Sequence, residues 1–185
     1  MEAKVNQAHS ALIEKCRDGD INAHYELYQL YSKAMYNVST RIMSNHEDAQ
    51  DVLQDAFLDA FKSLNKFRGD SSFGSWLKRI VVNKSINALK KKNKNGEVRF
   101  DDFHVSVVES NGVHSEEELD YQPEMIQTAI NRLPEGCRVV FTLYYLEGYK
   151  HKEIAKTLNV SVSTSKSQLN RAKKLLQKTL KTQLI

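Results

Sequence analysis

The sequence has few of the residues that interrupt a helix. It contains two prolines and seven glycines in 185 residues, and most of them stand at the edges of segments. Long stretches with helical spacing of apolar residues lie between them, and no stretch shows the alternation and hairpin turns typical of β-strands. Pro123 and Pro134 stand where helices can begin, and Gly148 follows an apolar run as a glycine past a helix end does. These features predict an all-α protein.

Cysteine and histidine give no basis for a cross-linked or metal-dependent fold. The two cysteines, Cys16 and Cys137, lie far apart in helical stretches, so neither a disulfide framework nor a CxxC metal site is available. The six histidines are scattered and have no partner at ligand spacing. We therefore expect two buried thiols, no metal and no cofactor.

Long apolar runs are also absent. No segment approaches the roughly 20 apolar residues that span a bilayer. Residues 1–10 lack the apolar core of a signal peptide. We expect a cytoplasmic protein without membrane insertion.

Charges of the two signs are unevenly distributed along the chain. The net charge is about +4 in residues 1–94, about −7 in residues 95–122 and about +7 in residues 123–185. Basic segments of this kind favour binding to polyanions such as nucleic acid. We predict two small helical domains, 1–94 and 123–185, joined by an acidic flexible linker, 95–122. Apolar residues around Phe100 leave open whether part of the linker packs.

Residues 150–176 have the spacing of a helix-turn-helix. A short helix with Ile154, Ala155 and Leu158 inward precedes a turn at 159–161 and a longer helix. Projection of the longer helix places Val162, Ser165, Leu169, Ala172 and Leu176 on a packing face. The opposite side carries short polar and basic residues that suit a DNA groove. These candidate DNA-binding residues are Ser163, Thr164, Lys166, Ser167, Asn170, Arg171 and Lys174. A solvated basic helix in an ordinary bundle is the alternative.

Residues 47–64 combine an apolar stripe with a row of carboxylates. Asp48, Asp51, Asp55 and Asp59 recur every three or four residues, so they share one helix face and repel one another. Such a row is either solvated or a docking face for a basic partner.

An aromatic, serine-rich loop precedes a basic helix in residues 67–94. Residues 78–94 hold seven basic side chains and no acid, which predicts a second nucleic-acid face. Phe67, Phe73 and Trp76 surround the loop Arg68–Ser72, and aromatic rings beside basic groups can hold unstacked bases. Packing in the protein core is the alternative for all three rings.

Together these motifs resemble those of the bacterial sigma-70 family of RNA polymerase sigma factors. DAQDVLQDAF followed by FRGDSSFGSWLKRIVVNKSIN looks like its region 2, and LPEGCRVVFTLYYLEGYKHKEIAKTLNVSVSTSKSQLNRAKKLL looks like its region 4. Their order, separation and total length resemble the extracytoplasmic-function (ECF, group 4) subfamily, which has no separate region 3 domain.

The resemblance implies a sigma factor that binds core RNA polymerase, recognises the −35 and −10 promoter elements and promotes DNA melting. The longer helix of the helix-turn-helix would read the −35 element, and its domain would lean on the polymerase's β flap. The β′ clamp would be contacted by Asp48, Asp51, Gln54, Asp55 and Phe57. The loop would accept a base flipped from the −10 element, and the residues for −10 recognition and melting would be Arg68, Ser71, Phe73, Trp76, Lys78, Arg79, Asn83 and Lys90.

Further partners follow from the same resemblance. The acidic linker would enter the polymerase's template and RNA-exit path and imitate RNA. An anti-sigma factor would hold the protein inactive, and the protein would act as a monomer within the holoenzyme.

The chain departs from the family at two positions of the TVKSRL stretch, which reads STSKSQL here. Ser165 replaces a common valine and brings a hydroxyl to the packing face, where it needs an acceptor such as a preceding carbonyl. Gln168 replaces a common arginine and so removes a charge that would grip phosphate.

The sequence lacks the features that two other classes of function would need. A stand-alone helix-turn-helix regulator would need a dimerisation heptad or a sensing domain, and neither is visible. An enzyme acting on nucleic acid would need a metal-binding carboxylate cluster or a nucleophile with its base. The aspartates of residues 48–59 share one helix face and lack a facing histidine, so we expect no enzyme.

Overall fold

The computed structural model describes residues 2–93, 98 and 122–182, with side chains from His9 onward. All regular structure in these residues is helical, which confirms the predicted all-α class. The chain divides into two compact units, Met1–Lys92 and Asn93–Ile185. The predicted linker, 95–122, lies outside the described residues apart from Val98 and Gln122.

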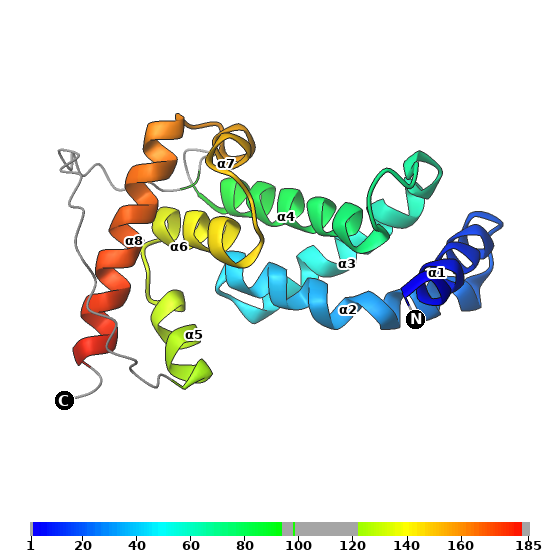
Figure 1. Cartoon of the computed structure of the whole chain (residues 1–185), viewed down its shortest axis with the longest axis horizontal. Coiled ribbons are helices and arrows are strands. Elements are labelled where there is room, and N and C mark those ends of the chain that lie inside the picture. Colours follow the sequence, from blue (N-terminus) through cyan, green and yellow to red (C-terminus); the bar gives the residue numbers. More distant parts are fainter. Residues whose placement is uncertain (1, 94–97, 99–121, 183–185) are drawn as a thin grey trace. The chain divides into compact units, whose positions relative to one another are not determined.

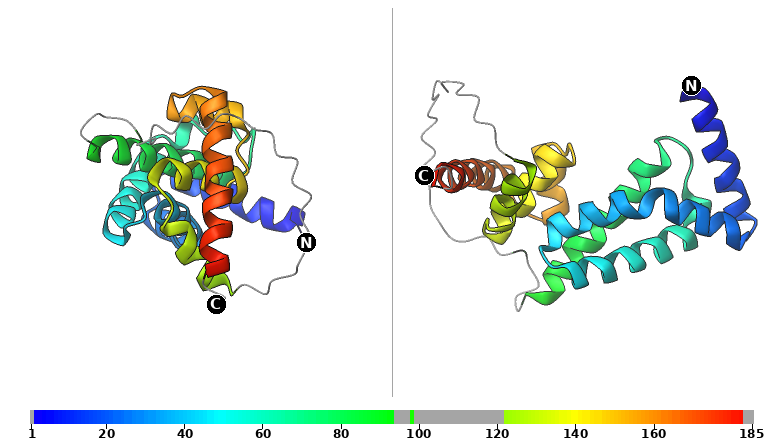
Figure 2. Two further views of the ribbon diagram at one scale, coloured as in Figure 1. Left: turned by 90° about the vertical axis from the view of Figure 1, so that its left-hand side faces the viewer. Right: turned by 90° about the horizontal axis from the view of Figure 1, so that it is seen from below.

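The first unit is a bundle of three long helices with a fourth helix at one end (Figures 1 and 2). α2 (Ile21–Met43), α3 (His46–Lys62) and α4 (Phe73–Lys92) pack against one another, and α1 (Glu2–Arg17) packs on α2 at a steep angle. A short 3₁₀ helix, η1 (Leu64–Lys66), follows α3. Apolar residues at helical spacing form the core of the bundle. The largest fully buried ones are Leu27, Ile42, Leu77, Val81, Val82 and Ile86.

Side-chain caps fix the corners of this bundle. Asp20 and Asn45 accept backbone N–H groups at the starts of α2 and α3. Ser44 ends α2 in the left-handed conformation, with φ of 57°. These capped turns fix the connection between α2 and α3. The side of α3 that carries the carboxylate row therefore has a fixed orientation in the bundle.

The second unit is built around its longest helix. It comprises α5 (Pro123–Asn131), α6 (Glu135–Phe141), a π-helical segment η2 (Thr142–Leu146), α7 (His151–Leu158) and α8 (Val162–Thr182). α5, α6 and α7 each pack against α8 (Figure 1). One core cluster contains Ala129, Ile130, Leu133, Cys137, Ala172 and Leu176. Pro123 and Pro134 stand at the starts of α5 and α6, as predicted.

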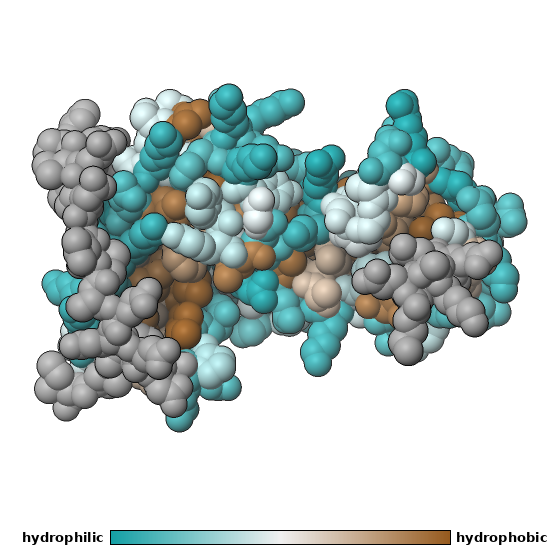
Figure 3. Space-filling model, viewed as in Figure 1, coloured by the Kyte–Doolittle hydropathy of each residue, from teal (hydrophilic) through white to brown (hydrophobic). Residues whose placement is uncertain are grey.

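The surface in the view of Figure 3 is mostly hydrophilic, with hydrophobic side chains in smaller areas. Large apolar side chains with more than half of their surface exposed include Ile21, Tyr25, Leu30 and Leu58. Within residues 2–93 and 122–182, no helix is both long enough and apolar enough to cross a membrane.

Candidate nucleic-acid and partner interfaces

Two of the four carboxylates in the α3 row are paired within the first unit. Asp48 Oδ2 lies 2.5 Å from Lys92 Nζ, and Asp59 Oδ2 lies 2.7 Å from Lys84 Nζ. The hydrogen bond with Asp59 raises the pKa of Lys84. Both lysines come from α4, so α4 neutralises the two ends of the row while its centre stays exposed.

The exposed centre of the row is a mixed polar and apolar surface, termed here the α3 face. It consists of Asp51, Gln54, Asp55 and Leu58, which recur at spacings of three and four residues. The Leu58 side chain is 55% exposed although it is apolar. Sequence reasoning missed Leu58; its position outside the apolar stripe was the available signal.

Phe57 is not part of this surface. Its side chain is 3% exposed, and its ring packs edge-on against Tyr28 with 4.7 Å between centroids. The sequence-based prediction placed Phe57 at the polymerase, whereas the structure places it in the core. The reason is its helical register, which it shares with the buried residues Leu53 and Ala60.

The loop between η1 and α4 is exposed along its middle and fixed where α4 begins. Arg68, Gly69, Asp70 and Ser71 are exposed, and Gly69 has a φ of +81°. The Ser72 hydroxyl accepts the Ser75 backbone N–H at 3.2 Å, which caps α4. Residues 68–71 are therefore exposed in a loop whose C-terminal end is fixed by the Ser72 cap.

The three aromatic rings beside the loop have different surroundings. Phe73 is 4% exposed and packs against Tyr31, with ring centroids 5.2 Å apart, so it belongs to the core. Phe67 and Trp76 are only half-buried, and their centroids lie 5.3 Å apart. Of the predicted aromatic contacts, Phe73 is therefore a support, and only Phe67 and Trp76 offer ring surface to a ligand.

The basic residues of α4 separate into two groups. Lys84 and Lys92 turn toward the carboxylates of α3. Arg79 and Asn83 are exposed, and Lys78 and Lys90 are half-buried. Positions 79, 83 and 90 share one side of the helix, so they form a continuous polar surface that leads away from the loop.

The helix-turn-helix has the predicted turn. Asn159 adopts the left-handed conformation with φ of 60°, and the Ser161 hydroxyl accepts the Thr164 backbone N–H at 2.9 Å. Ile154, Ala155 and Leu158 are buried, as predicted. Val162 is 38% exposed, contrary to the helical projection, because it is the first residue of α8 and lies beyond the packed part.

The outer side of α8 is polar and basic. Ser163, Lys166, Asn170 and Lys174 are exposed. Thr164, Ser167 and Arg171 are half-buried and border that surface. The predicted DNA-binding residues thus share one side of α8. The four exposed residues, Ser163, Lys166, Asn170 and Lys174, form the centre of that side.

On its inner side, α8 is joined to α7 by a polar contact. His151 Nδ1 lies 2.9 Å from the Ser165 hydroxyl, which is fully buried. The His151 ring stacks on Tyr144, with centroids 4.7 Å apart. Burial, together with the positive charges of Lys166 and Lys173, lowers the pKa of His151. The acceptor expected for Ser165 was a nearby carbonyl, and sequence reasoning missed His151.

A second inner contact joins α8 to α6. The thiol of Cys137, which is fully buried, donates to Gln168 Oε1 at 3.0 Å. Gln168 is itself 7% exposed. Position 168 therefore faces the interior in this chain, so the glutamine is a packing contact instead of a lost phosphate contact.

Comparisons with known proteins match two parts of the chain to two family models. Residues 27–95 match the family model described as "Sigma-70 region 2", and residues 124–176 match that described as "Sigma-70, region 4". The ECF RNA polymerase sigma-E factor of Escherichia coli K12 is 32% identical over 173 residues, which cover 89% of this chain and 90% of that protein. The chain belongs to the ECF family of RNA polymerase sigma factors.

Other relatives of this sigma factor extend the similarity over most of its length. The ECF RNA polymerase sigma-E factor of Haemophilus influenzae is 30% identical and covers 90% of this chain, with 92% of its own length matched. Among solved structures, the sigma factor RpoE of Bartonella quintana, in complex with the anti-sigma factor NepR, has a TM-score of 0.55 at 23% identity. The match covers 85% of this chain and 96% of that chain, and at this identity it supports the fold alone.

The family assignment confirms the resemblance inferred from sequence. The match to both regions favours a sigma factor over a stand-alone helix-turn-helix regulator, which would need only the second unit. In this sigma factor the first unit contains residues 27–92 of the region 2 match, with the α3 face, the loop and α4. The second unit contains the region 4 match, with the helix-turn-helix.

Proposed function

We propose that this sigma factor docks on core RNA polymerase through the α3 face and contacts a promoter with both units. One observation carries the proposal. A single chain combines a helix-turn-helix whose outer side is polar and basic with a second basic helix that begins beside an exposed loop and two half-buried rings. Two such surfaces in one chain suit binding to two separated DNA elements, whereas either surface alone would suit only one.

The outer side of α8 has the chemistry that −35 recognition needs. Asn170 can pair with an adenine edge in the major groove, and the short side chains of Ser163 and Thr164 allow the start of the helix to approach closely. Lys166 and Lys174 flank them and can neutralise phosphates. Arg171 lies at the border, so we assign it a contact with the backbone.

The loop and α4 have the chemistry that −10 melting needs. An unstacked base can be held by the ring surfaces of Phe67 and Trp76, with Arg68 and Ser71 at the exposed part of the loop. Arg79, Asn83 and Lys90 then track the strand along α4, with Lys78 beside them. Phe73 supports this surface from the core.

The proposal also covers contacts with the polymerase subunits and with an anti-sigma factor. The α3 face would meet the basic surface of the β′ clamp, and the second unit would contact the β flap. The charge of about −7 in residues 95–122 suits a segment that imitates RNA inside polymerase. An anti-sigma factor would compete for these surfaces, the protein would act as a monomer in the holoenzyme, and its site of action is the cytoplasm.

Reconstituted transcription with core polymerase tests the proposal. The wild-type chain should direct initiation from a linear promoter. Asp51→Lys/Asp55→Lys should weaken core binding by roughly tenfold or more, because charge complementarity across the interface is reversed. Asp18→Lys/Glu26→Lys makes the same change of charge at exposed positions outside the α3 face and should leave core affinity within about twofold. Equal affinities of the two double variants would exclude the α3 face as the dock.

A further inference from the structure

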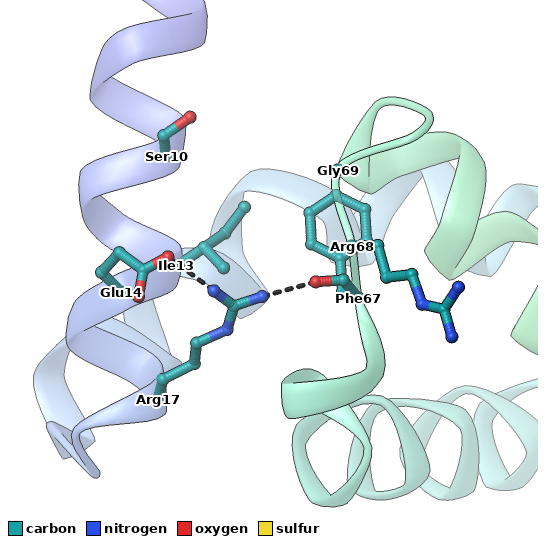
Figure 4. Close-up of a pocket in the computed structure, with 7 residues that line it drawn as sticks. All are labelled: Ser10, Ile13, Glu14, Arg17, Phe67, Arg68 and Gly69. Atoms are coloured by element: carbon teal, nitrogen blue, oxygen red, sulfur yellow. Dashed lines mark hydrogen bonds and ion pairs between the residues drawn. The ribbon is translucent and has the colours of Figure 1, made fainter.

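The loop that precedes α4 is anchored at its first residue by a side chain from α1. Arg17, the last residue of α1, reaches across to the loop, as Figure 4 shows. Its Nη2 donates to the Phe67 carbonyl at 2.5 Å and approaches the Leu64 carbonyl at 3.5 Å. Its Nη1 donates to Glu14 Oε1 at 2.6 Å. The guanidinium thus joins two elements that are 50 residues apart in sequence.

The carbonyls that Arg17 contacts belong to the first residue of η1 and to the residue that follows its end. The Leu64 carbonyl accepts the Phe67 N–H at 3.0 Å, which closes the 3₁₀ turn. Phe67 stands where the chain leaves the turn and enters the loop, and its carbonyl points toward Arg17 (Figure 4). A charged donor at this carbonyl makes a shorter and stronger hydrogen bond than a neutral one. Arg17 therefore fixes the peptide from which the exposed loop begins.

A hollow beside this contact separates α1 from the loop. It has a volume of about 150 Å³, and its walls are Ser10, Ile13, Glu14 and Arg17 from α1 and Phe67, Arg68 and Gly69 from the loop (Figure 4). Because the hollow lies between α1 and the loop, side-chain packing does not fill all of the space there. The Arg17 guanidinium spans it.

The two ends of the loop are consequently held in different ways. Ser72 fixes the far end as the cap of α4. Arg17 fixes the near end from a separate helix, which is attached to the bundle by the buried residues Leu12, Ile13 and Cys16. Between them, residues 68–71 are exposed, and the turn depends on Gly69 at positive φ. Without the anchor at Phe67, both the loop and the Phe67 ring would gain freedom that binding must remove.

We propose that Arg17 is a positioning residue for base capture: it holds the Phe67 peptide so that the loop and the Phe67 and Trp76 rings are arranged before an unpaired base arrives. This inference rests on the proposed function of the loop in −10 melting. Arg17 touches no base itself. Its contribution is to lower the ordering cost of the loop, so its loss should weaken binding only where a base is captured.

The test measures binding of reconstituted holoenzyme to single-stranded −10 oligonucleotides that carry either a base or an abasic site at the captured position. Wild-type holoenzyme should prefer the base by roughly tenfold, the range expected for stacking of one base on aromatic side chains. Arg17→Ala should reduce this preference to about twofold or less, since an unanchored loop loses the charge-assisted bond. Arg17→Lys, which keeps one charged donor and the aliphatic stem, should lie between them. Lys15→Ala removes an exposed basic side chain of the same helix and should keep the full preference.

The outcomes separate this inference from a general loss of structure and from failure of the proposed function. If Arg17→Ala weakened binding to both oligonucleotides equally, Arg17 would be only a structural residue and the inference would be overturned. A full base preference in Arg17→Ala would also overturn it. If Arg17→Ala did not fold, a full preference in Arg17→Lys together with normal thermal stability would count against the anchor. A wild-type holoenzyme with no preference at any position would instead refute the proposed function of the loop, and with it this inference.

Discussion

The polar contacts described for α4 in the first unit and for α8 in the second differ in their exposure to solvent. In the first unit, α4 packs on an apolar core, and its contacts with the α3 carboxylates lie at the surface, with Lys84 and Lys92 side chains 31% and 61% exposed. In the second unit, α8 is held from inside by hydrogen bonds of Ser165 and Gln168, both buried. Exposed ion pairs contribute about 0.2–1 kcal/mol and weaken with salt. Breaking a buried hydrogen bond costs about 1–3 kcal/mol when it leaves a polar group unsatisfied.

The surface pairs of the first unit and the buried contacts of the second have different consequences. The surface pairs of the first unit determine which carboxylates of α3 stay exposed, because they occupy Asp48 and Asp59 and leave Asp51 and Asp55 exposed to solvent. The buried contacts of the second unit determine how α8 is oriented on α6 and α7. Orientation matters most for a helix that must place side chains against base edges.

The largest effect on stability is expected from Gln168→Ala. The substitution leaves a cavity and removes the Gln168 acceptor of the Cys137 thiol, so we expect the second unit to lose about 2–3 kcal/mol of unfolding free energy. Hydrogen exchange of α8 amides in the full chain measures this loss. Gln177→Ala is the matched control, because Gln177 is exposed on the same helix and should change exchange by less than about 0.5 kcal/mol. Similar values for the two variants would contradict the role assigned to the inner contact.

A smaller effect is expected from protonation of His151. Burial, with Lys166 and Lys173 nearby, lowers its pKa below the ordinary value of about 6.5. The unfolded chain then takes up the proton first, so the stabilisation is present above the ordinary pKa and declines as the pH falls through that value toward the folded pKa. After correction for intrinsic exchange, α8 amides should lose protection between about pH 7.5 and pH 5.5. His151→Gln, which cannot titrate, should lose less over that range; a parallel loss in both proteins would exclude His151 as the cause.

The smallest effect is expected from the surface pairs of the first unit. Lys84→Gln and Lys92→Gln should each lower the unfolding free energy of this unit by less than about 1 kcal/mol. Denaturant unfolding followed by the fluorescence of Trp76, the single tryptophan, reports on this unit alone. The difference from wild type should shrink at about 1 M salt, where the Debye length is a few ångströms. A cost that persisted at high salt would mean that these pairs act like the buried contacts of the second unit.

Local patterns in the sequence were sufficient for α3, α4, α7 and α8 and for most of the residues on their packing sides. The spacing of Leu53, Ala56 and Ala60 predicts the buried stripe of α3, and the turn at Asn159 predicts the helix-turn-helix. These features depend on neighbours within a few residues, which periodicity reports directly. The same stripe includes Phe57, so the spacing favoured the core for this residue, and only the polymerase contact implied by the resemblance pointed elsewhere.

Contacts between helices could not be predicted in this way. Lys92 pairs with Asp48 across 44 residues, Arg17 reaches Phe67 across 50, and Cys137 meets Gln168 across 31. Each depends on how two elements lie against each other and on side-chain rotamers, and neither is encoded in the spacing of one segment. For this reason the acidic row looked uniform in sequence although two of its members are paired, and Gln168 looked like a lost DNA contact although it is buried.

The most direct test of the central claim, that each unit contacts its own promoter element, is site-specific cross-linking in the holoenzyme. Cys16 and Cys137 are buried, so a single photoreactive label can be attached through Asn170→Cys on α8 or Asn83→Cys on α4. We expect the label at position 170 to cross-link to the −35 element of the duplex and the label at position 83 to cross-link near the −10 element in a polymerase-dependent manner. Cross-links from both positions to the same element, or equal cross-linking without polymerase, would contradict the account.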